Sequence, residues 1–123
     1  MSQTDPVSQE RIRALAEARE LRVFLVTVGD LVRLQVLRQL AQKEEMSVTE
    51  LVRAVRVSQP LLSWHLGALK RVGLVRVRRD GRLVWYALNG SALRSSYQRF
   101  AVWLGMDVAF VGKEGERHDQ ERG

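Results

Sequence analysis

With 123 residues and a formal net charge of +6, the chain has the length of one small domain and an excess of basic side chains. It contains no cysteine, which excludes disulfide bonds, thiolate metal sites, thiol redox sensors and cysteine nucleophiles. No apolar run approaches the roughly 20 residues that cross a bilayer, and the polar N-terminus has no secretory signal, so we expect a cytoplasmic protein without a membrane partner.

The first predicted helix covers residues 9–28 and follows a polar segment, residues 1–8, that we expect to be flexible. Apolar residues recur along the helix at approximately helical spacing: Ile12, Leu15, Leu21, Leu25 and Val28. The β-branched end of this segment, VFLVTV, taken alone also fits a strand. Gly29 is expected to end the helix and Asp30 to cap the next one.

A second helix is predicted over residues 31–41, before a short polar loop with the sequence QKEEM. Its expected buried face is formed by Leu34, Leu37, Leu40 and Ala41, with Val36 beside them.

Residues 47–73 predict two short helices joined by a tight turn. The sequence Ser-Val-Thr-Glu from Ser47 to Glu50 is a capping box at the start of the first helix. Residues 56–58 form the turn, and Ser58 caps the second helix, in whose first turn Pro60 is tolerated. The expected inward positions of the two helices are Leu51, Val52, Val55, Leu62, Leu66, Leu69 and Val72.

Two strands are predicted next, over residues 74–78 and 82–88, with Asp80 and Gly81 as a two-residue hairpin turn. The positive charge of the chain is concentrated here, because residues 53–82 contain eight Lys or Arg residues and one Asp. Two helices followed by a basic hairpin are the layout of a winged helix-turn-helix, which places its second helix in the major groove of DNA.

A last helix is predicted over residues 92–111, capped by Asn89 or Ser91. Its main apolar stripe contains Leu93, Tyr97, Phe100, Leu104, Val108 and Val111. The charge-dense residues 112–123 are expected to be disordered, so the domain is expected to span residues 9–111. The fold class is therefore mainly α with a small β-hairpin.

The expected DNA contacts come from the second helix of the motif and from the hairpin. Gln59 suits adenine, Leu61 a thymine methyl group, and Ser63 a base or a phosphate. Trp64 either packs against DNA or folds into the core, and His65 either donates to a phosphate or packs between helices. The predicted DNA-binding residues are Ser58, Gln59, Leu61, Ser63, Trp64, His65, Arg78, Arg79 and Arg82. The hairpin arginines would bind phosphate or the minor groove, unless they only keep the hairpin soluble. Arg53, Arg56, Lys70 and Arg71 are expected to contact the DNA backbone.

The first and last helices carry more apolar surface than a small core needs, which favours a homodimer. Off the main stripe of the last helix lie Trp103, Met106, Ala109 and Phe110, which either cover the core or are buried by pairing across a two-fold axis. Trp103 and Met106 could also line an effector pocket.

The stretch from about Val28 to Leu88 resembles the ArsR/SmtB family of bacterial winged-helix repressors. VGDLVRLQVLRQLA is similar to the family's ALADPTRLRILRLL helix, with Leu31 where proline is usual. Ser58, Gln59, Ser63, His65, Leu66, Leu69, Gly73, Leu74 and Val75 stand at the positions of the family signature. The resemblance implies a homodimer that binds an imperfect inverted repeat in double-stranded DNA, represses a nearby operon, and releases DNA when an effector binds.

The effector is where the chain departs from the family pattern. SVTELVRAV has no cysteine, and residues 92–111 supply only Asp107 where paired Asp, His and Glu ligands are usual. We therefore expect no metal and no cofactor, but a small-molecule effector, a protein effector or constitutive binding. The chain has no Gly-rich phosphate loop and no catalytic triad spacing, so we expect no enzyme activity. The alternatives are a winged-helix protein-interaction module and a sequence-tolerant architectural DNA-binding protein.

Overall fold

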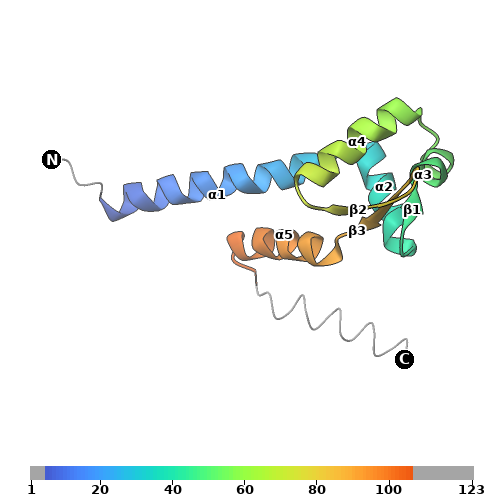
Figure 1. Cartoon of the computed structure of the whole chain (residues 1–123). Helices are drawn as coiled ribbons and strands as arrows, with labels where there is room; N and C mark the ends of the chain where they lie inside the picture. Colours follow the sequence, from blue (N-terminus) through green and yellow to red (C-terminus); the bar gives the residue numbers. More distant parts are fainter. Residues whose placement is uncertain (1–4, 107–123) are drawn as a thin grey trace, which may run out of the picture.

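The computed structural model of the protein describes residues 5–106 (Figure 1). Within this range the chain forms five helices and one small sheet, in agreement with the predicted fold class. In chain order the elements are α1 (Pro6–Val28), α2 (Leu31–Gln42), β1 (Met46–Ser47), α3 (Val48–Val55), α4 (Gln59–Arg71), β2 (Val75–Asp80), β3 (Leu83–Leu88) and α5 (Gly90–Trp103). No helix of the described residues is both long and apolar enough to cross a membrane.

The sheet has three antiparallel strands in the order β1-β3-β2. Its first strand, β1, was predicted as loop and cap; Met46 pairs there with Tyr86 of β3. In the β2–β3 hairpin, Asp80 pairs with Leu83, so the two turn residues are Gly81 and Arg82. The prediction of an Asp80–Gly81 turn was therefore wrong by one residue. Gly81 has φ +60° at the first central position, where type II′ turns require glycine.

Side-chain oxygens cap the helices at their N-termini and fix where the helices begin. Asp5 caps α1, Asp30 caps α2, Ser47 caps α3, Ser58 caps α4 and Asn89 caps α5. Because α1 begins at Pro6, residues 6–8 are helical and not part of a flexible segment. The VFLVTV end of α1 is helical too.

The last helix is shorter than its apolar spacing predicts. Helix α5 ends at Trp103, and Gly105 adopts the left-handed conformation with φ +82°. A glycine in this conformation just after a helix is a common termination signal. The prediction of helix across residues 104–106 was therefore wrong, while residues 107–111 and the predicted tail lie outside the described residues.

The core lies between α2, α3, α4 and the sheet. Its largest fully buried side chains are Leu40, Met46, Leu51, Leu62, Leu66, Leu69, Leu74 and Val36. The predicted inward face of α2 needs two corrections, since Leu34 is 48% exposed and Ala41 is exposed as well, whereas Val36 is 0% exposed. The helix thus turns Val36, Leu37 and Leu40 towards α4.

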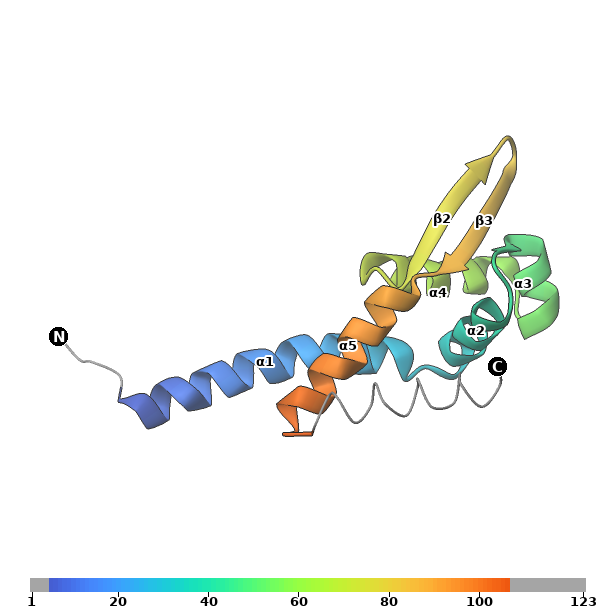
Figure 2. The ribbon, with the colours of Figure 1, turned by 90° about the horizontal axis from the view of Figure 1, so that it is seen from below.

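Helices α1 and α5 lie close to each other (Figure 2), and both also reach the core, against which Phe24 and Val28 of α1 and Ala92 and Leu93 of α5 pack. Arg99 of α5 and Glu20 of α1 form an ion pair across them, with 2.9 Å between Nη2 and Oε2. The N-terminal part of α1 extends past α5 in both views (Figures 1 and 2). The helix-turn-helix and the hairpin occupy the opposite end of the molecule.

Candidate nucleic-acid interface

Helices α3 and α4 are joined by a tight turn that the chain builds from Arg56, Val57 and Ser58. Arg56 adopts the left-handed conformation, with φ 62° and ψ 49°, and its backbone N–H donates to the carbonyl of Val52. The Ser58 hydroxyl then accepts a hydrogen bond from the backbone N–H of Leu61, which starts α4. This geometry gives the sharp change of direction that a helix-turn-helix needs.

Helix α4 has one buried face and one exposed face. Leu62, His65, Leu66 and Leu69 are buried against the core. The predicted DNA-binding residues Ser58, Gln59, Leu61, Ser63 and Trp64 are all exposed at its N-terminal half. The structure therefore places five of the six predicted residues around α4 on one accessible surface.

Trp64 is on the exposed face, with 60% of its surface accessible, and so does not fold into the core. The guanidinium carbon of Arg33, on α2, lies 5.2 Å from the centroid of the Trp64 ring. The His65 ring meets Trp64 edge-on, with a centroid distance of 5.0 Å and an interplanar angle of 72°. Trp64 is thus solvent-accessible and laterally supported.

His65 is the exception among the predicted contacts, because it is only 4% exposed and packs between helices. Its Nδ1 accepts a hydrogen bond from Arg33 Nε at 3.0 Å and lies 3.6 Å from Asp30 Oδ1. The prediction that His65 reaches DNA therefore does not fit this geometry. Its spacing with Leu62, Leu66 and Leu69 was the sequence signal that placed it on the buried face.

Asp30 has two functions at this joint. Its Oδ1 accepts the backbone N–H of Arg33 at 3.1 Å and so caps α2. This hydrogen bond is the main cause that lowers the pKa of Asp30. Asp30 is therefore held in its ionised form beside His65 and Arg33.

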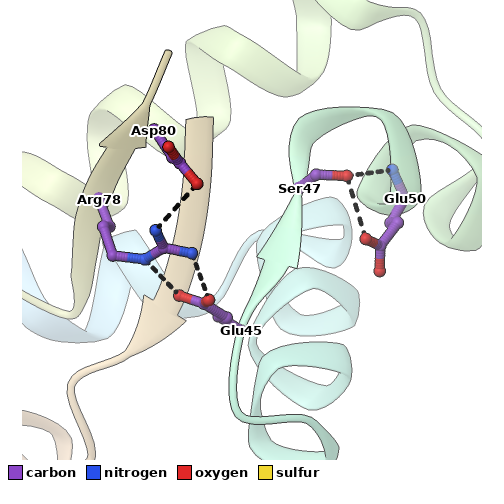
Figure 3. Close-up of polar contacts among 5 residues, drawn as sticks. All are labelled: Glu45, Ser47, Glu50, Arg78 and Asp80. Atoms are coloured by element: carbon purple, nitrogen blue, oxygen red, sulfur yellow. Dashed lines mark hydrogen bonds and ion pairs between the residues drawn. The ribbon is translucent and has the colours of Figure 1, made fainter. Parts of the chain in front are cut away.

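The hairpin, called the wing below (residues 75–88), presents its three predicted arginines in different ways. Arg78 is tied to the molecule by Glu45: Nη2 lies 2.6 Å from Oε1, and Nε lies 3.1 Å from Oε2 (Figure 3). Asp80 lies 3.8 Å from Arg78 Nη1, and the guanidinium carbon is 5.7 Å from the Trp85 ring centroid. Arg78 is thus paired within the protein, although its side chain is still 52% exposed, and its contact with DNA stays a prediction.

The Arg78–Glu45 hydrogen bond shifts the pKa values of both groups. It is the largest cause that lowers the pKa of Glu45 and the largest that raises the pKa of Arg78. Each charge therefore stabilises the ionised form of the other. No local sequence pattern predicts that Glu45 pairs with Arg78, since the two residues are 33 positions apart in the chain.

Arg79 is exposed near the end of β2, and Arg82 is exposed in the wing turn. Arg53, Arg56, Lys70 and Arg71 are exposed on α3, the turn and the end of α4. The helix-turn-helix and the wing thus expose these six cationic side chains, which suits a polyanionic partner.

A second accessible surface is apolar and lies on α1, on α5 and on the residues directly after α5. It includes Ile12, Leu15, Val102, Trp103 and Met106. Trp103 and Met106 are 41% and 51% exposed, so the alternative that they cover the core is wrong. Trp103 lines two hollows along α1, of about 410 and 550 Å³. Among the described residues, no three His, Cys, Asp or Glu side chains are grouped closely enough to hold a metal ion.

Comparisons with known proteins agree with this geometry. A family model described as a helix-turn-helix domain matches residues 28–78. The HTH-type transcriptional regulator KmtR of Mycobacterium tuberculosis is 38% identical over 90 residues, which are 73% of this chain and 64% of that protein. The transcriptional repressor SmtB homolog of Synechocystis is 31% identical over 93 residues, 76% of this chain and 70% of that protein. The chain thus spans about two thirds of the length of these curated relatives.

A third relative links sequence and structure. The transcriptional activator HlyU of Vibrio cholerae is 37% identical over 73 residues, 59% of this chain and 67% of that protein. The solved structure of reduced HlyU superimposes with a TM-score of 0.57 at 34% identity, covering 72% of this chain and 90% of that one.

Proposed function

The chain belongs to the ArsR/SmtB family of winged helix-turn-helix transcriptional regulators, and we propose that it is a sequence-specific DNA-binding protein that acts as a dimeric repressor. The observation that carries the proposal is the exposed face of α4. It presents Gln59, Leu61, Ser63 and Trp64 outward, and the helix-turn-helix and wing also expose basic side chains. This combination supplies base readout and phosphate attraction on one surface.

Each exposed residue of α4 has a chemical partner in the major groove. Gln59 forms paired hydrogen bonds with adenine N6 and N7, and Leu61 packs on a thymine methyl group. Ser63 binds a base edge or a phosphate. Trp64 offers a large apolar ring to sugars and thymine methyl groups.

The basic side chains position the protein on the duplex. Arg79 and Arg82 contact phosphates or enter the minor groove beside the wing. Arg53, Arg56, Lys70 and Arg71 contact the DNA backbone. Ser58 acts mainly as the cap that fixes the start of α4, and its place there brings it close to the phosphates.

Dimerisation supplies the second half of the binding site. The exposed apolar side chains of α1 and α5 would be buried by pairing with a second copy of the chain. Two copies of α4 would then lie about one DNA turn apart, roughly 34 Å, over the halves of an inverted repeat. The partner of the dimer is therefore double-stranded DNA with approximate two-fold symmetry.

The direction of regulation is part of the proposal. Relatives carry both the name repressor and the name activator. A reporter gene under the protein's own upstream DNA tests the direction: repression predicts higher expression when the regulator gene is deleted, and activation predicts lower expression. DNA binding is either controlled by a small-molecule or protein effector, or it is constitutive.

The function is tested by fluorescence anisotropy with DNA from upstream of the protein's own gene, over a series of salt concentrations. Specific binding predicts an affinity at least about 10³-fold above that for scrambled DNA at physiological salt. Equal affinity for both sequences contradicts sequence-specific regulation and supports the architectural alternative.

Matched variants separate DNA binding from protein binding. Arg79→Ala with Arg82→Ala should lower the slope of log affinity against log salt by up to about 1.8, because each lost phosphate contact contributes about 0.9. The control pair Arg11→Ala and Arg13→Ala removes the same charge from the far end of α1 and should leave the slope nearly unchanged.

A further inference from the structure

Arg33 connects three helices at the base of α4. Its Nε donates to His65 Nδ1 of α4 at 3.0 Å, and its Nη1 lies 3.4 Å from the carbonyl oxygen of Thr27 in α1. Its backbone N–H donates to Asp30 Oδ1, so the start of α2 is fixed as well. Bonds from different directions therefore hold the guanidinium group in one place.

The same guanidinium group lies beside Trp64. A separation of 5.2 Å between its carbon and the ring centroid is within the roughly 6 Å range of cation–π attraction. Trp64 is exposed, and an exposed side chain without lateral support samples several rotamers. Ordering such a side chain on DNA costs conformational entropy, which support in the free protein reduces.

His65 provides the acceptor that orients Arg33. A neutral imidazole accepts a hydrogen bond at Nδ1 when its proton is on Nε2. Burial of His65 on the core face of α4 keeps this acceptor fixed relative to the neighbouring residue Trp64. Arg33 therefore contacts both His65 on the buried face of α4 and Trp64 on its exposed face, and it links the two side chains.

We infer that Arg33 and His65 are positioning residues, which hold Trp64 in the orientation that contacts DNA and so contribute to sequence preference. Neither residue contacts DNA itself. The inference rests on the proposed function, in which the exposed face of α4 reads base pairs. It assigns a role to His65, a buried residue at a signature position, and to Arg33, a partly buried residue of α2.

The test is a double-mutant cycle on DNA binding with Trp64→Ala, Arg33→Met and the double variant, measured against operators that differ at single base pairs. Arg33→Met should lose preference at the same base pairs as Trp64→Ala, by roughly fivefold. The double variant should bind no more weakly than Trp64→Ala, because Arg33 acts through Trp64. The salt slope should stay unchanged.

Two results would overturn the inference. Additive losses in the cycle mean that Arg33 acts independently of Trp64. A fall of about 0.9 in the salt slope for Arg33→Met means that Arg33 itself contacts a phosphate. If the wild-type protein shows no sequence preference, the proposed function itself is contradicted. If the wild-type protein shows a preference but the losses of affinity in the cycle are additive, only the inference about Arg33 and His65 is overturned.

Conservative variants keep the test independent of folding. Arg33→Lys retains the charge but has no Nε–H for His65, so it should lose the same base preference as Arg33→Met. His65→Leu removes the acceptor and should resemble Arg33→Met, whereas His65→Asn returns an acceptor oxygen near the position of Nδ1 and should recover part of the preference. Arg38→Met, an exposed position of α2, is the matched control and should retain it. Circular dichroism melting confirms that each variant is folded.

Discussion

Glu45 and Arg78 form a bidentate ion pair that fastens the wing to the segment leading into β1 (Figure 3). Met46, the next residue, pairs with Tyr86 of β3 and is buried in the core. The ion pair therefore joins a fixed point of the sheet to the strand of the wing that leads to its turn. Bidentate pairs of arginine with a carboxylate restrict orientation as well as distance.

Glu45→Gln should weaken DNA binding although it makes the protein more positive. Loss of the ion pair leaves the wing less well oriented, and the expected decrease in affinity is roughly threefold to fivefold. Anisotropy with operator DNA at low salt measures the effect.

Glu44→Gln is the matched control, since Glu44 is the exposed neighbour and the change in charge is the same. By simple charge attraction both variants would bind DNA more tightly. Tighter binding by Glu45→Gln would therefore show that the ion pair does not orient the wing for DNA.

Leu62→Ala should destabilise the fold while Leu61→Ala should not, although the two residues are adjacent. Leu62 is fully buried, and its truncation should cost about 2–5 kcal/mol of unfolding free energy. Leu61 is 42% exposed, so its truncation should change stability by less than about 0.5 kcal/mol. Urea unfolding measures both values. Leu61→Ala should instead weaken operator binding, and unchanged binding would remove Leu61 from the proposed base contacts.

Asp30 should stabilise the fold in a pH-dependent way. Its pKa is lowered in the folded protein, mainly by the backbone N–H of Arg33, so its contribution is present above the unfolded pKa and is lost as pH falls through the folded pKa. Asp30→Asn retains a capping oxygen but does not titrate. The difference in unfolding free energy between the two proteins should be constant near neutrality and should diminish below about pH 3.9. A difference that grows in acid would contradict this assignment.

Leu15→Glu should prevent dimerisation without unfolding the monomer. Leu15 is exposed on α1, and a carboxylate there would be buried without a partner in the proposed interface. Sedimentation velocity should show a monomer, and operator affinity should fall at least about tenfold because one half-site is lost. Leu83→Glu, exposed on the wing, is the control for the oligomeric state. A Leu15→Glu protein that stays dimeric would move the interface away from this face.

Local sequence signals were sufficient for much of the fold. Ser47, Ser58 and Asp30 were predicted as caps and are caps, because capping depends on residues within one turn. The winged helix-turn-helix itself is confirmed. The strand β1 was not predictable, since two residues have too little pattern of their own and depend on pairing with β3.

The same distinction between local pattern and tertiary contact applies to the predicted DNA-binding residues. Periodicity in the sequence determined which face of α4 is exposed, and hence that Gln59, Leu61 and Ser63 are accessible. Only the tertiary structure decided the environments of Arg78 and Trp64, because their partners Glu45 and Arg33 come from distant parts of the chain. Helical periodicity and capping depend on residues that are close in the chain, so they can be predicted from a single sequence. Ion pairs and ring contacts between elements depend on how the elements pack, and packing brings together residues whose relation no local pattern records.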